Sequence, residues 1–207
     1  MGPDVNPRQR NRRGQGRLLR EKILTAAAAL LTESGSEDAV TLRAVARRAG
    51  IAAPSIYSHF TDREAIVEEL IRRGFDELTA AVRAAADADP ARPLRAACRA
   101  YLDFATANPA GYRLLFDRRR RADSRLTDPR PAAELLGADA FGTLVRLIAR
   151  PGAADGDAER DAAALWVALH GYATLRQSVP AFPWPDDEQM LTMLIDRIVQ
   201  GPQVPAT

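Results

Sequence analysis

The chain has 207 residues, of which 46% are hydrophobic and 27% are charged, as is ordinary for a soluble globular protein long enough to bury a sizeable core. No apolar run approaches the length that spans a bilayer, and the charged N-terminus lacks the apolar stretch of a secretory signal. The single cysteine, Cys98, excludes an internal disulfide and fits a reducing cytoplasm, where we expect the protein.

The net charge is only +2, but it is unevenly distributed. Residues 1–63 hold eleven Arg or Lys and six Asp or Glu, whereas residues 64–207 hold eighteen and twenty-one. A basic front and a faintly acidic remainder are expected of a DNA-binding head joined to a regulatory body. Chance clustering of a solvated charged face would explain the charges alone equally well.

Residues 1–17 contain five arginines, one acidic residue and no aliphatic run after Val5. Because they cannot bury enough surface to offset the entropy of ordering, we predict a disordered arm. Such an arm could follow DNA into the minor groove, where arginine is favoured. It could equally be a solvated leader that adds only non-specific attraction, and the sequence leaves both open.

Residues 18–63 are predicted to form a small helical head. A first helix from Leu18 to about Glu33 ends before Gly35. A second, capped by Thr41, has the spacing of a helix with one buried face and ends at Gly50. A third begins at Pro54, a residue tolerated in a first helical turn.

The last two of these helices have the pattern of a helix-turn-helix, which places its second helix in the DNA major groove. Residues 39–61 carry three arginines and no Asp or Glu. Ile56 and Phe60, four apart, are predicted to face inward, so that the polar residues between them face out.

The amino-acid pattern of this stretch is similar to that of a known family. The pattern T-L-R-x-V-A-x-x-A-G-I-x-x-x-S-I-Y-x-H-F-x-x-R-E-x-I resembles the N-terminal signature of the tetracycline-repressor (TetR) family of transcriptional regulators, from about Leu18 to Leu70. Where that family usually has Lys before the Glu, this chain has Arg63, which keeps the charge.

The resemblance implies that seven residues face DNA. We expect Arg43 and Ser55 to read base edges. Phosphate contacts that set the register are expected of Thr41, Tyr57, His59 and Arg63. Arg47 and Arg48 would add longer-range attraction. The seven residues are Thr41, Arg43, Ser55, Tyr57, Ser58, His59 and Arg63.

Residues 64–207 are predicted to form a helical effector-binding and dimerisation domain, which makes the whole chain all-α with about nine helices. Thr61 to Glu64 matches a capping box, so a long helix should run from Asp62 to about Ala86, with a possible bend at Gly74. Its positive N-terminal end is a potential phosphate site.

The rest of the body is also predicted to be helical. Helices are expected at 94–107, around 112–116 and at 132–149, the last interrupted by Gly137 and Gly142. The polar stretch 118–131, with its run of four arginines, is predicted to be a surface loop, and 151–157 a linker.

The final two helices, expected at 157–179 and 186–200, carry more apolar surface than one chain can cover. A second copy, packed as a four-helix bundle, is the economical solution, and the last two helices form the dimer interface in the TetR family. Trp166, His170 and Gly171 resemble the C-terminal type named for Trp-His-Gly. The predicted interface residues are Leu165, Leu169, Leu191, Leu194, Ile195 and Ile198.

A cluster of aromatic residues is predicted to surround the middle of the body. In the TetR family this space is usually a pocket for a small apolar effector, and such pockets are lined by aromatic side chains. The same spacing also suits ordinary core residues, and His170 in particular could be a hydrogen-bonded core histidine. The candidate pocket residues are Phe75, Tyr101, Phe104, Tyr112, Phe116, Trp166 and His170.

Enzymatic chemistry is not indicated. One cysteine and two histidines cannot supply a spaced set of metal ligands, and neither a nucleophile elbow nor a phosphate-binding glycine loop is present. We therefore expect no catalytic residues, no metal and no cofactor.

The sequence predicts a dimeric regulator that binds a near-palindromic DNA operator, is released as a repressor by a small-molecule effector, and has no membrane partner. The alternatives are an activator or a ligand-insensitive regulator of the same fold, or a helical enzyme or small-molecule-binding protein with a structural head.

Overall fold

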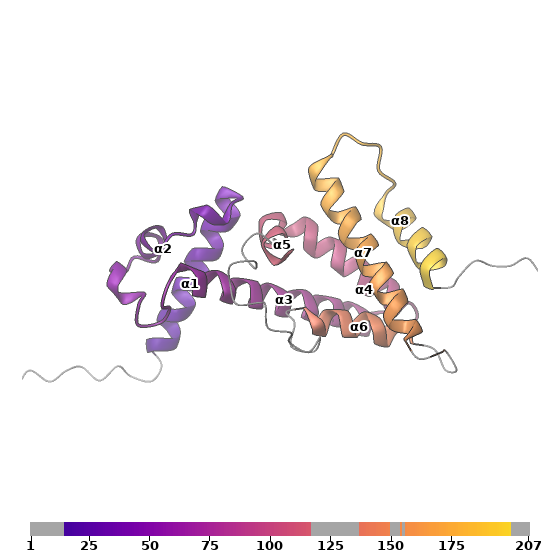
Figure 1. Cartoon of the computed structure of the whole chain (residues 1–207), viewed down its shortest axis with the longest axis horizontal. Helices are drawn as coiled ribbons and strands as arrows, with labels where there is room; N and C mark the ends of the chain where they lie inside the picture. Colours follow the sequence, from indigo (N-terminus) through magenta and orange to yellow (C-terminus); the bar gives the residue numbers. More distant parts are fainter. Residues whose placement is uncertain (1–14, 117–136, 150–153, 155, 200–207) are drawn as a thin grey trace, which may run out of the picture. The chain divides into compact units, whose positions relative to one another are not determined.

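The computed structural model describes residues 15–116, 137–149, 154 and 156–199. Over these residues the chain is all-helical, as expected, and forms eight α-helices without any strand (Figure 1). None of the described helices is both long and apolar enough to cross a membrane. The predicted loop at 118–131 lies outside the described residues, as does most of the linker at 151–157.

The chain divides into two compact units between Leu70 and Ile71. The sequence predicts a boundary at residue 63/64, near the start of the long helix, whereas this division falls inside that helix. Ile66 and Val67, on its first two turns, are buried and belong to the first unit. The helix therefore supplies residues to two cores.

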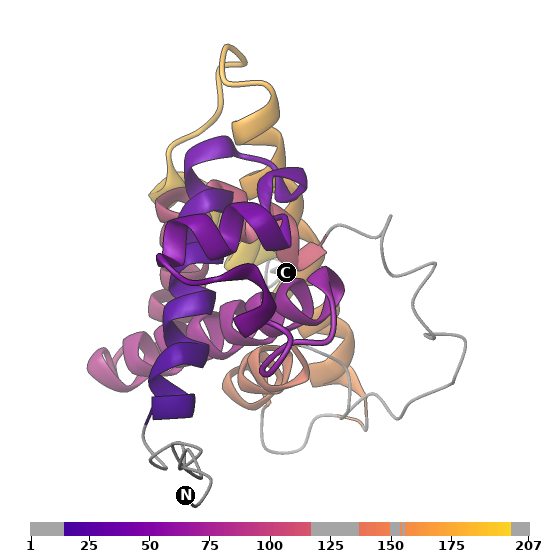
Figure 2. The same cartoon turned by 90° about the vertical axis from the view of Figure 1, so that its left-hand side faces the viewer.

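The first unit contains α1 (Gln15–Ser34), a 3-10 turn at Glu37–Ala39, α2 (Leu42–Ala49), a 3-10 turn at Ala53–Ser55, and the start of α3 (Arg63–Ala88). Helix α2 packs across α1 (Figure 2). Residues 15–17, predicted to belong to the disordered arm, form the first turn of α1, while residues 1–14 lie outside the described residues.

The predicted helix at Pro54 is shorter than expected. The amides of Ser55 and Ile56 donate to carbonyls three residues back, at 2.9 and 3.1 Å, which makes a 3-10 turn rather than an α-helix. A further turn follows over 56–59. Ile56 and Phe60 nevertheless face inward, as predicted, and are buried.

The cap of α3 lies one residue later than predicted. The Oδ1 atom of Asp62 accepts from the amide of Ala65 at 2.8 Å, whereas the hydroxyl of Thr61 donates to Asp62 at 3.1 Å. Asp62 immediately precedes the first helical residue, so its carboxylate is better placed to accept. Gly74, where the sequence predicts a possible bend, lies within α3, which runs without a break from Arg63 to Ala88.

The second unit comprises the rest of α3 and α4 (Pro93–Ala107), α5 (Pro109–Phe116), α6 (Ala138–Ile148), α7 (Asp157–Ser178) and α8 (Asp187–Leu194), which continues as a π-helical turn at Ile195–Val199. Gly137, with φ 88°, precedes α6 rather than interrupting it, and Gly142 lies inside α6 without breaking it. Residues 132–136 of the predicted helix lie outside the described residues.

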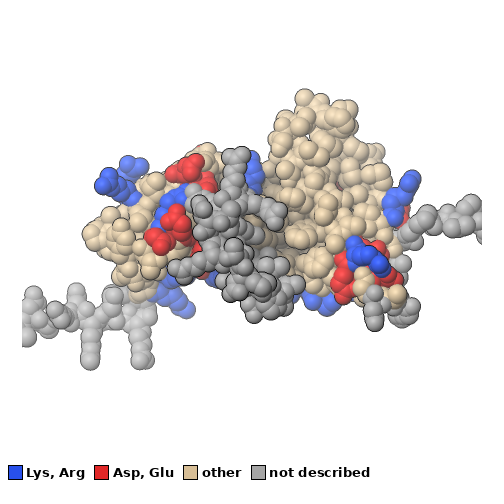
Figure 3. All heavy atoms as spheres, in the orientation of Figure 1, with Lys and Arg blue, Asp and Glu red and all other residues tan. Residues whose placement is uncertain are grey.

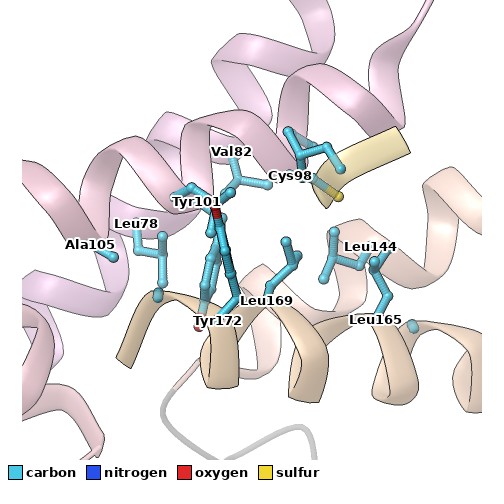
Figure 4. Packing of buried hydrophobic residues seen from close by; sticks show 14 of the residues in the cluster. Leu78, Val82, Cys98, Tyr101, Ala105, Leu144, Leu165, Leu169 and Tyr172 are labelled. Atoms are coloured by element: carbon cyan, nitrogen blue, oxygen red, sulfur yellow. The ribbon is translucent and has the colours of Figure 1, made fainter. Parts of the chain in front are cut away.

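Helices α3, α4 and α7 meet in the core of this unit (Figure 4). Leu78 and Val82 come from α3, Tyr101 from α4, and Leu165 and Leu169 from α7. Gly74 allows close packing here, because a Cβ at this position would lie 2.7 Å from Leu115 Cδ2. Helix α8 is tied to α4 by Glu188, whose carboxylate accepts from Arg95 at 3.2 Å and from Arg99 at 2.9 Å.

Candidate nucleic-acid interface and internal pocket

Helix α2 has the capping and the burial pattern needed to present a polar face. The Thr41 hydroxyl accepts from the amide of Ala44 at 3.2 Å, and Gly50, with φ 60°, closes the other end in the left-handed conformation. Val45 and Ala46 are buried, which leaves Arg43 and Arg47 exposed.

The arginines of α2 differ in their partners. Arg48 makes a bidentate pair with Glu33 of α1, with both N–O distances at 2.6 Å. Neither Arg43 nor Arg47 has a hydrogen-bonded or ionic partner among the described residues. Arg43 and Arg47 thus carry the uncompensated charge of this helix, and the predicted contribution of Arg48 is reduced by its acidic neighbour.

The segment after α2 exposes most of its predicted DNA-facing residues. Tyr57 is 60% exposed, Ser58 is exposed, and Ser55 and His59 are half-buried. The Ser58 hydroxyl donates to the carbonyl of Ser55 at 2.8 Å. Two buried anchors, Ile56 and Phe60, hold this short segment in place, so that an aromatic ring and an imidazole lie on the surface beside small side chains.

Arg63 is held differently from the other predicted contacts. Its Nε donates to the carbonyl of Val40 at 2.8 Å and its Nη2 donates to the carbonyl of Glu37 at 2.6 Å. The side chain is only 19% exposed and also lies 3.4 Å from the carboxylate of Glu64. The guanidinium thus fixes the chain that leads into α2. The sequence gives no sign of this arrangement, since neither carbonyl belongs to a recognisable motif.

A small cavity lies in the second unit, where α3, α4, α5, α6 and α7 each contribute at least one lining residue. Its volume is about 10 Å³, about the space of one water molecule. Four of the predicted pocket residues line it: Phe75, Tyr101, Phe116 and Trp166. The others, Phe104, Tyr112 and His170, do not.

One helix lines this cavity that the sequence does not indicate. Helix α6 contributes Phe141 and Leu144, and α3 contributes Leu78 and Val82 in addition to the predicted Phe75. The aromatic ring of Phe141 on an apolar helix was an available signal. The close approach of Gly137 to the ring of Phe75, where a Cβ would lie 2.7 Å from Cε1, was not.

Tyr112 and His170 are joined to the cavity by hydrogen bonds. Trp166 Nε1 donates to the Tyr101 hydroxyl at 3.3 Å, the hydroxyls of Tyr101 and Tyr112 lie 2.7 Å apart, and the Tyr112 hydroxyl lies 2.7 Å from His170 Nδ1. Burial raises the pKa of Tyr101 to about 12 and lowers the pKa of His170. His170 is thus a hydrogen-bonded, half-buried residue, one of the two interpretations that the sequence left open.

Three of the predicted interface residues are in the wrong place for that role. Leu165, Leu169 and Leu191 are fully buried in the core of a single chain, so they have no surface left to bury against another copy. Leu194, Ile195 and Ile198 are half-buried. The large apolar residues exposed on α7, α8 and the segment between them are Val167, Leu175, Val179, Phe182 and Met193.

Family models match most of the chain. Residues 23–70 match the model described as "Bacterial regulatory proteins, tetR family", and residues 94–198 match "Tetracyclin repressor-like, C-terminal domain". The chain belongs to the TetR family. This is a family of transcriptional regulators rather than of enzymes, as the sequence indicated. Its likeness to the Trp-His-Gly type stays a prediction.

Two HTH-type transcriptional regulators are similar to parts of the chain. The transcriptional activator FasR of Mycolicibacterium smegmatis is 32% identical over 138 residues, which cover 64% of this chain and 60% of FasR. The transcriptional repressor KstR2 of Mycobacterium tuberculosis is 41% identical over 81 residues, 39% of this chain and 40% of KstR2. The chain therefore matches less than two thirds of the length of either relative.

Solved structures share the fold over nearly the whole chain. A protein of unknown function from Rhodococcus sp. RHA1 aligns with a TM-score of 0.70 at 25% identity, covering 95% of this chain and 98% of the other. A transcriptional regulator from the same organism aligns at 0.67 and 26%, covering 90% and 99%. The TetR regulator PfmR of Thermus thermophilus, at 0.60 and 22%, covers 88% and 99% and supports the fold alone.

Proposed function

We propose that this TetR protein is a homodimeric, operator-binding repressor that a small, largely apolar ligand releases from DNA. The observation that carries the DNA-binding part is the surface of the helix-turn-helix. There Arg43 has no hydrogen-bonded or ionic partner among the described residues, and Tyr57, which is 60% exposed, lies on the same stretch 39–61, which contains no acidic residue. An unpaired cation and exposed polar groups on such a stretch suit phosphate and base contacts.

Dimerisation is proposed to use α7, α8 and the segment between them. Figure 3 shows that the surface over the C-terminal half of α7 and the segment after it carries no charged side chain in this view. Val167 is exposed on α7, Phe182 on the segment after α7, and Met193 on α8. We infer that these exposed apolar side chains belong to an interaction surface, and a two-fold dimer would place two DNA-binding heads on successive major grooves about 34–36 Å apart.

Release by a ligand is proposed to work through linkage. A ligand that binds the second unit better in the conformation that does not fit DNA must weaken DNA binding by the same differential affinity. Helix α3 supplies residues to both units, which supports it as the element that couples them. A difference of about 2.8 kcal/mol in the free energy of ligand binding between the two conformations would reduce DNA affinity roughly a hundredfold.

Activation is the second candidate function, because FasR is described as an activator. Repression by occupancy of a promoter needs only DNA binding and release, for which the chain has candidate surfaces. Transcription in vitro from a template carrying a bound site separates the two. A fall in transcript with added protein supports repression, and a rise supports activation.

Salt titration of DNA binding tests the proposal. A regulator that neutralises about six phosphates should lose roughly 10³-fold in affinity between 50 and 200 mM salt. Fluorescence anisotropy with a labelled duplex would measure the loss for the native chain, for Arg43→Ala, and for Arg48→Ala as a matched control. Arg43→Ala should weaken binding more than Arg48→Ala, whose guanidinium is already paired. A duplex affinity that changes neither with the salt concentration nor in the Arg43→Ala variant would instead support a helical enzyme or small-molecule-binding protein.

A further inference from the structure

Four side chains form a hydrogen-bonded row that leads from the cavity to His170, in the order Trp166, Tyr101, Tyr112 and His170. Trp166, the first member, sets the direction in which the hydrogens are donated. An indole N–H can only donate, so Trp166 Nε1 gives its hydrogen to the Tyr101 hydroxyl. The Tyr101 hydrogen is then free for Tyr112, and the Tyr112 hydrogen for His170 Nδ1. In this first order the hydrogens of Trp166, Tyr101 and Tyr112 each have an acceptor within the row, and the His170 hydrogen is on Nε2.

A second order is possible in principle, with His170 Nδ1 donating to Tyr112 and Tyr112 donating to Tyr101. Tyr101 would then have to donate its own hydrogen elsewhere. Its only hydrogen-bond partners among the described residues are Tyr112 and Trp166, and Trp166 cannot accept. A buried donor left without an acceptor costs about 1–3 kcal/mol, so the first order is favoured unless a group in the cavity accepts from the Tyr101 hydroxyl.

The lining of the cavity decides what could supply the missing acceptor. Among the described residues that line it, only Tyr101 and Trp166 carry polar side-chain atoms, and none is charged. An ionised ligand group would be desolvated there without a charged partner, at high cost. An uncharged carbonyl oxygen is an acceptor that donates nothing in return, so it suits the second order alone.

We propose that the pocket takes a largely apolar, uncharged ligand with one carbonyl oxygen, that this oxygen accepts from the Tyr101 hydroxyl, and that its arrival reverses the row so that His170 carries its hydrogen on Nδ1. This inference rests on the proposed ligand pocket. The ligand must also displace side chains, because the cavity as it stands has a volume of only about 10 Å³. Recognition of the oxygen is thereby coupled to a change at α7, the helix that carries His170 and Trp166.

The test uses two probes of similar shape, acetophenone and ethylbenzene, which differ in the carbonyl oxygen. The chain has only two histidines, His59 and His170, so ¹⁵N labelling of histidine gives a simple spectrum in which His59 is an internal control. We expect acetophenone to bind about three- to tenfold more tightly than ethylbenzene. It should also shift the His170 hydrogen from Nε2 to Nδ1, with His59 unchanged. Ethylbenzene should leave His170 in the Nε2–H form.

Tyr101→Phe supplies the matched variant, since it keeps the ring and removes the hydroxyl. The two probes should bind this variant equally, and neither should change the His170 ring. If the native chain bound both probes with equal affinity, or bound acetophenone without a change in the His170 ring, the inference would be overturned. The proposed ligand pocket would still stand. Binding of neither probe would overturn the ligand pocket of the proposed function, and the inference with it.

Discussion

Arg63 donates from Nε to the carbonyl oxygen of Val40 at 2.8 Å, joining the first residue of α3 to the residue before the cap of α2. A second bond, from Nη2 to the carbonyl of Glu37 at 2.6 Å, fixes the same stretch. The resemblance implied a phosphate contact for this residue. Its geometry instead favours a role in holding the entry to α2, and with it Thr41 and Arg43.

Replacing Arg63 separates these two roles. Arg63→Ala should destabilise the first unit by roughly 1–3 kcal/mol, because bonds from a charged donor to two carbonyls are lost. DNA affinity should fall, but the slope of log affinity against log salt should stay the same. A lysine cannot bridge both carbonyls with a rigid fork, so Arg63→Lys should not restore affinity. Thermal unfolding and anisotropy measure both effects.

A direct phosphate contact would give the opposite pattern. Arg63→Ala would then reduce the salt slope by about one, and Arg63→Lys would retain most of the affinity. Hydrogen exchange of the α2 amides provides an independent check, since only the positioning role predicts faster exchange there in Arg63→Ala.

Much of the first unit could be predicted from the sequence because its signals are local. Thr41 and Gly50 bound α2 as expected, since a cap and a left-handed glycine depend on only a few neighbouring residues. The 3-10 turn at Ala53–Ser55 was missed because Pro54 is compatible with both helix types. The backbone partners of Arg63 are 23 and 26 residues away, and no spacing rule reaches that far.

The second unit shows the limit of helical periodicity. The apolar pattern of the last two helices correctly indicated burial, but it could not tell burial within one chain from burial between two. Leu165, Leu169 and Leu191 belong to the core of one chain. Val167, which the interface prediction left out, is 69% exposed.

Substitutions on α7 should therefore distinguish residues of the core, which affect stability, from residues of the proposed interface, which affect self-association. Leu165→Ala should destabilise the protein by about 2–5 kcal/mol, because it leaves a cavity in a packed core. Val167→Glu should leave unfolding of a single chain nearly unchanged but weaken self-association, since it places a charge on exposed apolar surface. Chemical denaturation and sedimentation measure the two effects. A Val167→Glu chain that self-associates as tightly as the native one would remove α7 from the proposed interface.

A fall in pH should weaken the attachment of α8 to α4, because it protonates Glu188. The guanidinium of Arg95 holds the pKa of this carboxyl below its usual value, with Arg99 also contributing. A folded-state pKa that is lowered gives stability that is present above the unfolded value and is lost as the pH falls through the folded value. Glu188→Gln should remove this part of the acid dependence. Hydrogen exchange of the α8 amides between pH 7 and pH 3 measures it, and equal pH profiles for both proteins would count against the pairing.

Cys98 should be unreactive toward thiol reagents in the folded protein. The residue is fully buried in the core, and burial raises the pKa of its thiol to about 12. Because the thiolate is the reactive form, a thiol reagent should label Cys98 only when the second unit opens. Labelling at native conditions should be far slower than in denaturant. Rapid native labelling would mean that α4 separates from the core much more readily than its packing indicates.

Operator binding requires that two copies of the helix-turn-helix surface act together on one DNA duplex. Genome-wide recovery of the DNA bound by the native chain, set against Tyr57→Ala, tests this most directly. We predict a near-palindromic site whose half-sites lie about one helical turn apart, roughly 34–36 Å, and its loss from the Tyr57→Ala sample while the dimer persists. Recovery of no common sequence, or of the same sequence with Tyr57→Ala, would contradict the account.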